Sequence, residues 1–226
     1  MQFNRPQEQL SLDLPVSAAS ARDDLIVTPA NQQAVEFLDS WPQWPGPIAI
    51  LAGPIGSGKT HLAKVWATRS GARFVTPDLT GEQDIPAGGN LVVEDLRQGS
   101  FSETWLFHLI NSVRASSASL LLTSRRWPGD WGLALPDLKS RMKLAHLMEL
   151  YEPDEIMLNG VLQKLFSDRQ IEVDPAIVQY IVQRMERSLA SAQIVVDEVD
   201  RLSLQQKRKV TKPLVADALH NLDLSV

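Results

Sequence analysis

Residues 53–60 read Gly-Pro-Ile-Gly-Ser-Gly-Lys-Thr, and this stretch decides the fold class. It fits the pattern of a phosphate-binding loop, in which glycines, a lysine and a threonine stand at fixed spacing. The apolar run Ile48–Ala52 before it is typical of a strand buried on both faces, and a helical pattern over Leu62–Thr68 follows it. The glycines let backbone N–H groups turn toward phosphate oxygens, and the start of the helix adds partial positive charge. The sequence therefore predicts a phosphate site between this strand and this helix.

Two side chains of the loop have distinct expected roles. Lys59 is expected to neutralise β- and γ-phosphate oxygens, and the Thr60 hydroxyl is expected to bind Mg²⁺. The loop residues predicted to bind the nucleotide are Gly53, Gly56, Ser57, Gly58, Lys59 and Thr60.

An acidic pair follows a second apolar strand, Leu91–Val93. Phosphate-loop ATPases need an acid at such a strand end to hold Mg²⁺, and often a second one to position water. We therefore predict Glu94 as the metal ligand and Asp95 as the catalytic acid, with a solvated strand end as the alternative. Glu94 is one methylene longer than the usual Asp, which puts intrinsic hydrolysis in question.

The order of predicted elements gives an α/β fold class: a domain with a parallel sheet and flanking helices over 24–150, then a small all-helical domain over 151–226. Residues 1–23 are predicted to form a flexible tail. Asp174 is predicted to cap a helix that begins at Pro175. The strands are expected at Ile48–Ala52, Leu91–Val93 and Leu120–Leu122, and the helices at Asn31–Trp41, Leu62–Thr68, Phe101–Val113, Asp154–Phe166, Pro175–Arg187, Ala190–Leu204 and Pro213–Leu222.

Composition excludes several classes of protein. The 226 residues are 44% hydrophobic and 22% charged, as in an ordinary globular protein. The absence of cysteine rules out disulfides and thiolate metal sites, and the four histidines lack metal-ligand spacing. A net charge of −5 argues against direct binding of duplex DNA. Without a signal peptide or a long apolar run, we expect a cytoplasmic location and no membrane contact.

Four segments together resemble the DnaA-related branch of the AAA+ ATPases over about residues 24–223. They are GPIGSGKTHLAK, VVED, LLLTSRRWP and LPDLKSR. The resemblance implies an AAA+ nucleotide-binding domain followed by a helical lid domain. The family's DNA-binding helix-turn-helix domain has no counterpart in this sequence, so the resemblance implies that DNA is contacted mainly indirectly. His61 follows Thr60 in the first of these segments, so the resemblance adds it to the candidate nucleotide-binding residues, without a chemical role of its own.

The tail contains a hexapeptide that looks like the sliding-clamp-binding motif of bacterial replication proteins, which implies the DNA polymerase III sliding clamp as a partner. Alternate leucines in an extended peptide can fill pockets of such a partner, and the stretch Pro15–Thr28 is expected to act as a tether. The clamp-binding residues are Gln9, Leu10, Ser11, Leu12, Asp13 and Leu14.

The segment Leu138–Arg141 resembles the family segment that contains the arginine finger. Such a finger presents a planar guanidinium to the γ-phosphate held by a neighbouring protomer, here DnaA. Arg141 is thus the expected catalytic residue in trans. The alternative is that Arg141 belongs to a solvated basic set, with Arg125, Arg126, Lys139 and Lys143.

Two departures from the family pattern argue for weak hydrolysis. Arg125 stands in the sensor-1 segment where DnaA has an acidic residue, and it cannot orient water as a carboxylate does. Ala190 aligns with the sensor-2 arginine, although Arg187, about one turn earlier, can take its place. The resemblance implies an ADP-bound active form.

The segment Asp24–Gln33 resembles the family's adenine-binding stretch, with Ile26, Val27 and Asn31 as its candidate residues. An equally weighted alternative is a plain helix entry, with Thr28 or Asn31 as the N-cap.

The resemblance implies a function in the negative regulation of chromosomal replication initiation. A nucleotide-bound protein docked on the clamp would stimulate ATP hydrolysis by DnaA. The alternative is an autonomous phosphate-loop ATPase that assists helicase or clamp loading. A small-molecule kinase is disfavoured because the C-terminal helices resemble an AAA+ lid. The expected cofactors are ADP or ATP with Mg²⁺; intrinsic ATPase activity and a homodimer are left open.

Overall fold

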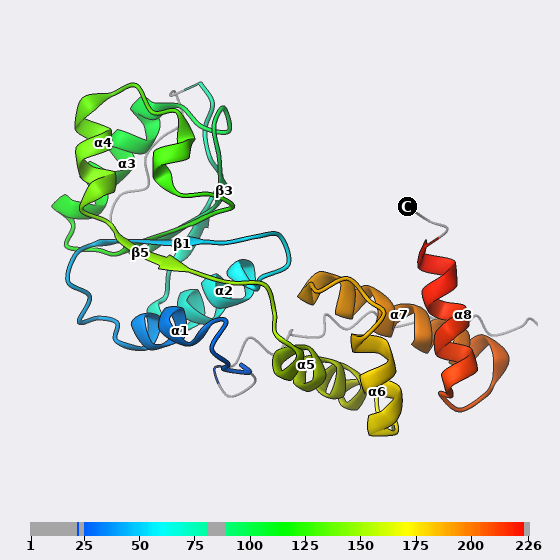
Figure 1. Ribbon diagram of the computed structural model, residues 1–226. Coiled ribbons are helices and arrows are strands. Elements are labelled where there is room, and N and C mark those ends of the chain that lie inside the picture. The colour runs from blue at the N-terminus through cyan, green and yellow to red at the C-terminus, as the bar shows by residue number, and fades with distance from the viewer. Residues whose placement is uncertain (1–21, 23–24, 81–88, 224–226) are drawn as a thin grey trace, which may run out of the picture.

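The computed structural model describes residues 22, 25–80 and 89–223 (Figure 1). Its sheet has five parallel strands in the order β2-β3-β4-β1-β5. This confirms the predicted α/β class with a parallel sheet. The strands are β1 (Ile48–Ala52), β2 (Arg73–Val75), β3 (Leu91–Leu96), β4 (Leu120–Ser124) and β5 (His146–Glu149).

The two edge strands, β2 and β5, were not predicted from the sequence. Strand β2 has only three residues, none of them buried, and β5 buries Met148 alone. Neither has the continuous apolar run that identifies the three central strands. Strand β3 is also longer than predicted, so Glu94 and Asp95 lie within it rather than after it.

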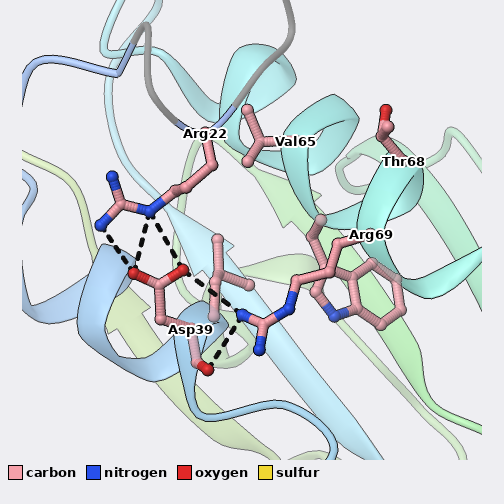
Figure 2. Close-up of a pocket in the computed structure, with 7 residues that line it drawn as sticks. Arg22, Asp39, Val65, Thr68 and Arg69 are labelled. Atoms are coloured by element: carbon pink, nitrogen blue, oxygen red, sulfur yellow. Dashed lines mark hydrogen bonds and ion pairs between the residues drawn. The ribbon is translucent and has the colours of Figure 1, made fainter.

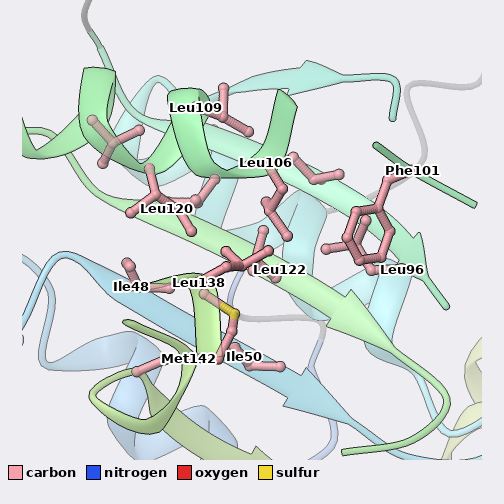
Figure 3. Close-up of a cluster of buried hydrophobic side chains, with 14 of the residues drawn as sticks. Ile48, Ile50, Leu96, Phe101, Leu106, Leu109, Leu120, Leu122, Leu138 and Met142 are labelled. Carbon is pink, nitrogen blue, oxygen red and sulfur yellow. The ribbon is translucent and has the colours of Figure 1, made fainter. Parts of the chain in front are cut away.

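Helices cover both faces of the sheet (Figure 1). Alternate strand residues point to opposite faces, so Ile50 packs in the cluster with α3 and α4 while Ala49 and Leu51 pack in the cluster with α1 and α2. Figure 3 shows the first of these clusters, in which Leu106, Leu122 and Leu138 meet. The helices are α1 (Gln32–Asp39), α2 (Lys59–Ser70), α3 (Glu103–Ala115) and α4 (Pro136–Lys143), with a short 3-10 helix over Pro128–Trp131.

The C-terminal helices form a second core of their own, which supports the predicted helical domain. Leu162, Phe166 and Val196 are fully or almost fully buried in it. The predicted cap is confirmed, because the Asp174 Oδ1 atom accepts a hydrogen bond of 2.8 Å from the Ala176 N–H. One helix is shorter than predicted and ends at Val182 rather than at Arg187. The helices are α5 (Glu155–Asp168), α6 (Pro175–Val182), α7 (Leu189–Gln206) and α8 (Lys212–Asp223).

Of the predicted tether Pro15–Thr28, the structure describes Arg22 and residues 25–28. Arg22 pairs with Asp39, which also pairs with Arg69, beside a pocket of about 230 Å³ (Figure 2). Thr28 is 5% exposed, so the part of Pro15–Thr28 nearest the domain is packed rather than free. The clamp-binding motif at 9–14 lies outside the described residues. In the described part of the chain, no helix has the length and apolar character needed to cross a membrane.

Candidate functional site

The phosphate loop lies between β1 and α2, at the carboxyl ends of the parallel strands, as predicted. Gly56 and Gly58 have φ angles of +76° and +94°, which side chains rarely adopt. The Gly53 N–H donates to the Ser124 carbonyl at 3.2 Å, so the loop is tied to the end of β4. Helix α2 then begins at Lys59, and its first N–H groups face the loop. The backbone can therefore cradle an anion here.

Lys59 points into this loop. Its Nζ donates to the Gly53 carbonyl at 2.8 Å and to the Pro54 carbonyl at 2.6 Å. Partial burial lowers the pKa of Lys59, the charge of Asp95 opposes that effect, and Arg125 adds to it. The Asp95 carboxylate and the Arg125 guanidinium thus both act electrostatically on this ammonium, which lies within the loop as expected of a group that binds phosphate.

The two predicted metal ligands both carry oxygen atoms, which are the donors that Mg²⁺ prefers. The Glu94 Oε1 atom is buried and has no hydrogen-bond partner among the described residues. Thr60 is exposed in the first turn of α2. The described residues contain no cluster of three or more carboxylate, histidine or cysteine ligands. Mg²⁺ on nucleotide phosphates needs only one or two protein carboxylates, so the available oxygens suit it.

Asp95 reaches the site, but both oxygens of its carboxylate are engaged. Arg125 Nε donates to Oδ1 at 2.9 Å and Arg125 Nη2 to Oδ2 at 3.1 Å. Arg97 donates to Oδ2 at 2.9 Å. The Asp95 N–H donates to Thr123 Oγ1 at 3.0 Å. Asp95 was predicted to act as the catalytic acid. In the structure its carboxylate is paired with two arginines, which the sequence did not indicate.

The predicted adenine segment lies between the sheet domain and α5. A side chain at Gly160 of α5 would begin 2.7 Å from Ile26 Cδ1, while Val27 is 42% exposed. Asn31 is buried: its Oδ1 accepts from the Thr28 N–H and its Nδ2 donates to the Ile26 carbonyl, both at 2.9 Å. Asn31 stands at the N-cap position of α1 but makes no side-chain bond to that helix. Its side chain instead holds the backbone turn before α1 through its hydrogen bonds to Ile26 and Thr28.

The lid contacts the phosphate loop directly, a feature not predicted from the sequence. The Leu189 N–H donates to the Gly56 carbonyl at 2.9 Å. A Cβ atom at Gly56 would lie 2.5 Å from the Ser188 side chain, so only glycine fits. The signal that could have indicated the start of α7 is Ser188 itself, which caps this helix.

The lid arginine proposed for sensor 2 has a different partner in the structure. Arg187 forms an ion pair of 3.0 Å with Glu155 of α5, and both side chains are more than half exposed. Ala190 lies in the first turn of α7. His61 is half-buried at the start of α2. A role for either Arg187 or His61 in nucleotide binding stays a prediction.

Arg141 lies on α4, on the opposite side of the sheet from α1 and α2 (Figure 1). Its guanidinium carbon is 4.7 Å from the centre of the Phe107 ring of α3. No carboxylate pairs with Arg141 anywhere in residues 22, 25–80 and 89–223. Leu144, three residues further on, is 81% exposed. The structure thus separates Arg141 from Lys59 and Asp95, and Phe107 is a contact that the sequence did not indicate.

Comparisons with known proteins find a family model that matches the C-terminal helices and a relative that matches most of the chain. A family model described as "Hda, lid domain" matches residues 157–219. An uncharacterized protein of Haemophilus influenzae is 24% identical over 191 residues, which cover 77% of this chain and 82% of that protein.

Solved structures share the fold. Domain III of the Thermotoga maritima replication initiation protein DnaA has a TM-score of 0.76 and 16% identity, covering 92% of this chain and 98% of that one. AMPPCP-bound DnaA from Aquifex aeolicus gives 0.62 and 17%, covering 85% and 67%. The RuvB Holliday junction branch migration motor of T. maritima gives 0.71 and 17%, covering 90% and 72%. These similarities confirm the AAA+ fold and its helical lid.

Proposed function

We propose that this Hda-like, DnaA-related chain, which joins an AAA+ domain to a lid of the Hda type, is a negative regulator of replication initiation. It would act by stimulating ATP hydrolysis on DnaA. The lid match and the DnaA-like fold support a regulator from this group. The proposal has three more specific parts. The chain docks on the sliding clamp, Arg141 acts as the arginine finger, and the protein is located in the cytoplasm.

Nucleotide binding is the first part of the proposal. The left-handed glycines, the inward Lys59 ammonium and the start of α2 together form a cradle for phosphate oxygens. A bound phosphate would replace the loop carbonyls as the acceptor for Lys59. Thr60 and Glu94 would hold Mg²⁺, which would supply positive charge at the phosphates. DnaA of Aquifex aeolicus binds AMPPCP on a similar fold, which supports an adenine nucleotide here.

The observation that carries the proposal is the free guanidinium of Arg141. It is half-buried on the Phe107 ring and has no carboxylate partner among the described residues. The ring holds the guanidinium without neutralising it. An arginine placed in this way can contact a phosphate on another molecule at little cost in side-chain entropy. Because Lys59 lies in the phosphate loop of this chain, Arg141 is not needed for its own nucleotide.

The alternative, an autonomous ATPase, rests on the phosphate loop and on the fold shared with the RuvB motor. The two functions differ in where ATP is consumed. A regulator consumes little ATP alone and increases hydrolysis on DnaA, whereas an autonomous ATPase turns over ATP without DnaA.

The experiment is a reconstitution with the full chain, clamp-loaded DNA and DnaA carrying labelled ATP. We expect conversion of DnaA-bound ATP to ADP to accelerate only when all three components are present. Conversion at the rate of DnaA alone would overturn the proposal. Rapid multiple turnover by the chain in the absence of DnaA would instead support the autonomous ATPase.

A further inference from the structure

We propose that Arg125 withholds Asp95 from catalysis, so that the phosphate loop retains a nucleotide without activating water against it. This inference rests on the nucleotide binding in the proposed function and deepens it. It names a residue pair, the Asp95–Arg125 pair, that would make the domain hold its nucleotide rather than consume it.

The backbone places Asp95 at the point where β3 leaves its regular register. The pairing of β3 with β4 shifts between Val93 and Leu96, and Asp95 within that shift has a φ of +52°. A left-handed conformation is uncommon for a residue other than glycine and persists where its surroundings fix it. Here the hydrogen bond from the Asp95 N–H to Thr123 Oγ1 on β4 fixes it. The carboxylate consequently faces the end of β4.

The residue before Arg125 is held even more firmly. Ser124 is fully buried, and its Oγ lies 2.8 Å from the Leu96 carbonyl and accepts the Trp131 Nε1–H at 3.0 Å. Its carbonyl accepts the Gly53 N–H. These contacts join the end of β4 to β3 on one side and to the phosphate loop on the other. Arg125 thus emerges between Asp95 and the loop, and its guanidinium forms two parallel hydrogen bonds to the carboxylate.

This pairing opposes the chemical step. In hydrolysis, a water oxygen bonds to the γ-phosphorus, the bond from that phosphorus to the β–γ bridging oxygen breaks, and ADP and inorganic phosphate leave. The proton lost by the water must pass to a base such as a carboxylate oxygen. Both Asp95 oxygens already accept N–H donors from Arg125, and Oδ2 also accepts one from Arg97. Three N–H donors thus occupy most of the acceptor positions of the carboxylate, and a water at Asp95 would have to compete with two guanidiniums.

Neighbouring Glu94 is in the opposite situation. Its buried Oε1 has no partner in the described part of the chain, so it is available to a cation. The two acids of β3 thus have different roles in this proposal. Glu94 can help to bind the nucleotide, whereas the pairing of Asp95 hinders it from helping to cleave the nucleotide.

The first test measures single-turnover hydrolysis of prebound ATP by the full chain, without DnaA or clamp. Arg125→Ala should accelerate hydrolysis about tenfold or more, since a positioned general base contributes roughly 10²–10⁴. Asp95→Asn in the same chain should remove that gain. Arg126→Ala is the matched control, because it removes an adjacent arginine whose side chain makes no contact with Asp95.

The second test measures affinities for ATP and ADP by titration with fluorescent analogues, which does not depend on turnover. Asp95→Asn should raise the ATP-to-ADP affinity ratio several-fold, because it frees the Arg125 guanidinium for a terminal phosphate. Arg125→Ala should lower the same ratio, because it removes one of the two guanidiniums that offset the Asp95 charge beside that phosphate and leaves only Arg97.

Equal hydrolysis rates for Arg125→Ala and Arg126→Ala, with ATP still bound, would overturn the inference. The inference would also be overturned if the ATP-to-ADP affinity ratio changed in the same direction in Asp95→Asn and Arg125→Ala. A complete loss of ATP binding in Arg125→Ala would overturn it as well. Failure of the wild-type chain to bind either nucleotide would instead remove the nucleotide-binding part of the proposed function.

Discussion

Two arginines in different regions of the molecule have different partners. Arg125 lies at the edge of the sheet beside the phosphate loop, and Arg141 lies on the outer face over α3. At the loop, Arg125 donates two hydrogen bonds to the carboxylate of Asp95, which also pairs with Arg97. On the outer face, Arg141 rests on the Phe107 ring and its charge is not compensated within the described residues. Both guanidiniums are oriented, yet of the two only Arg141 lacks a carboxylate partner among the described residues.

Under the proposed function, this difference would let one AAA+ domain be inactive toward its own nucleotide and active toward that of a neighbour. Charge stabilisation of a transition state requires a cation that is oriented but not already neutralised. Pairing with a carboxylate removes that property, whereas contact with an aromatic face preserves it. Four predictions test the comparison, from the largest expected effect to the smallest.

Arg141→Ala should remove nearly all stimulation of hydrolysis on DnaA, a loss of roughly 10³–10⁵ if Arg141 is a finger. Arg141→Lys should also fail, because an ammonium lacks the planar fork. Single-turnover hydrolysis of labelled ATP on DnaA, with clamp-loaded DNA, measures the effect. Both variants should keep their affinity for ADP. Stimulation equal to that of the wild type in Arg141→Ala would end the comparison between the two arginines.

Replacing Leu10 and Leu12 together by Ala should reduce stimulation about 100-fold at low protein concentration, because the clamp would no longer raise the local concentration of the chain. Calorimetric titration with the purified clamp should show the matching loss of binding. Raising the concentration of the double variant should restore stimulation, since Arg141 is unchanged. A double variant that still binds the clamp normally would contradict the assignment of residues 9–14.

Lys59→Ala should weaken ADP binding about 10–100-fold, because a charge-assisted contact within a partly buried loop is lost. The increase in melting temperature that ADP produces should shrink accordingly. Lys64→Ala, an exposed position one turn further along α2, serves as the control. If ADP protects Lys59→Ala as well as it protects the control, the loop does not bind phosphate.

Phe107→Ala should lower the maximal rate of hydrolysis on DnaA a few-fold while leaving the concentration for half-maximal stimulation nearly unchanged. The reason is that the ring orients Arg141, and contacts of this kind contribute about 0.5–1 kcal/mol at exposed sites. Phe107→Tyr should behave like the wild type because it keeps the aromatic face. An equal decrease for Ala and Tyr would show that the ring does not position Arg141.

The central strands and the phosphate loop could be predicted because their signals are local. The run Ile48–Ala52 and the loop at 53–60 lie next to each other in the sequence, and each has a pattern tied to its own structure. The edge strand β5 exposes three of its four residues, so no apolar run indicates it. The cap Asp174 acts within two residues, which also makes it predictable.

The functional contacts that were missed join residues distant in the sequence. Asp95 and Arg125 are 30 positions apart and meet only because β3 and β4 are adjacent and β3 is distorted at Asp95. The sequence indicated that Arg125 reverses a charge, but it could not indicate which carboxylate would pair with it. Phe107 and Arg141 likewise meet because α3 and α4 cover the same face of the sheet.

The hydrogen bond between Leu189 and Gly56 makes the lid and the phosphate loop a thermodynamically linked pair. A ligand in the loop that favours one orientation of α7 must change the affinity of any molecule that distinguishes lid orientations. The reciprocal effect has the same magnitude, because binding free energies around a closed cycle sum to zero. A partner that binds one lid orientation more tightly than another would therefore alter the affinity of the loop for its nucleotide, even if it never approached the phosphates.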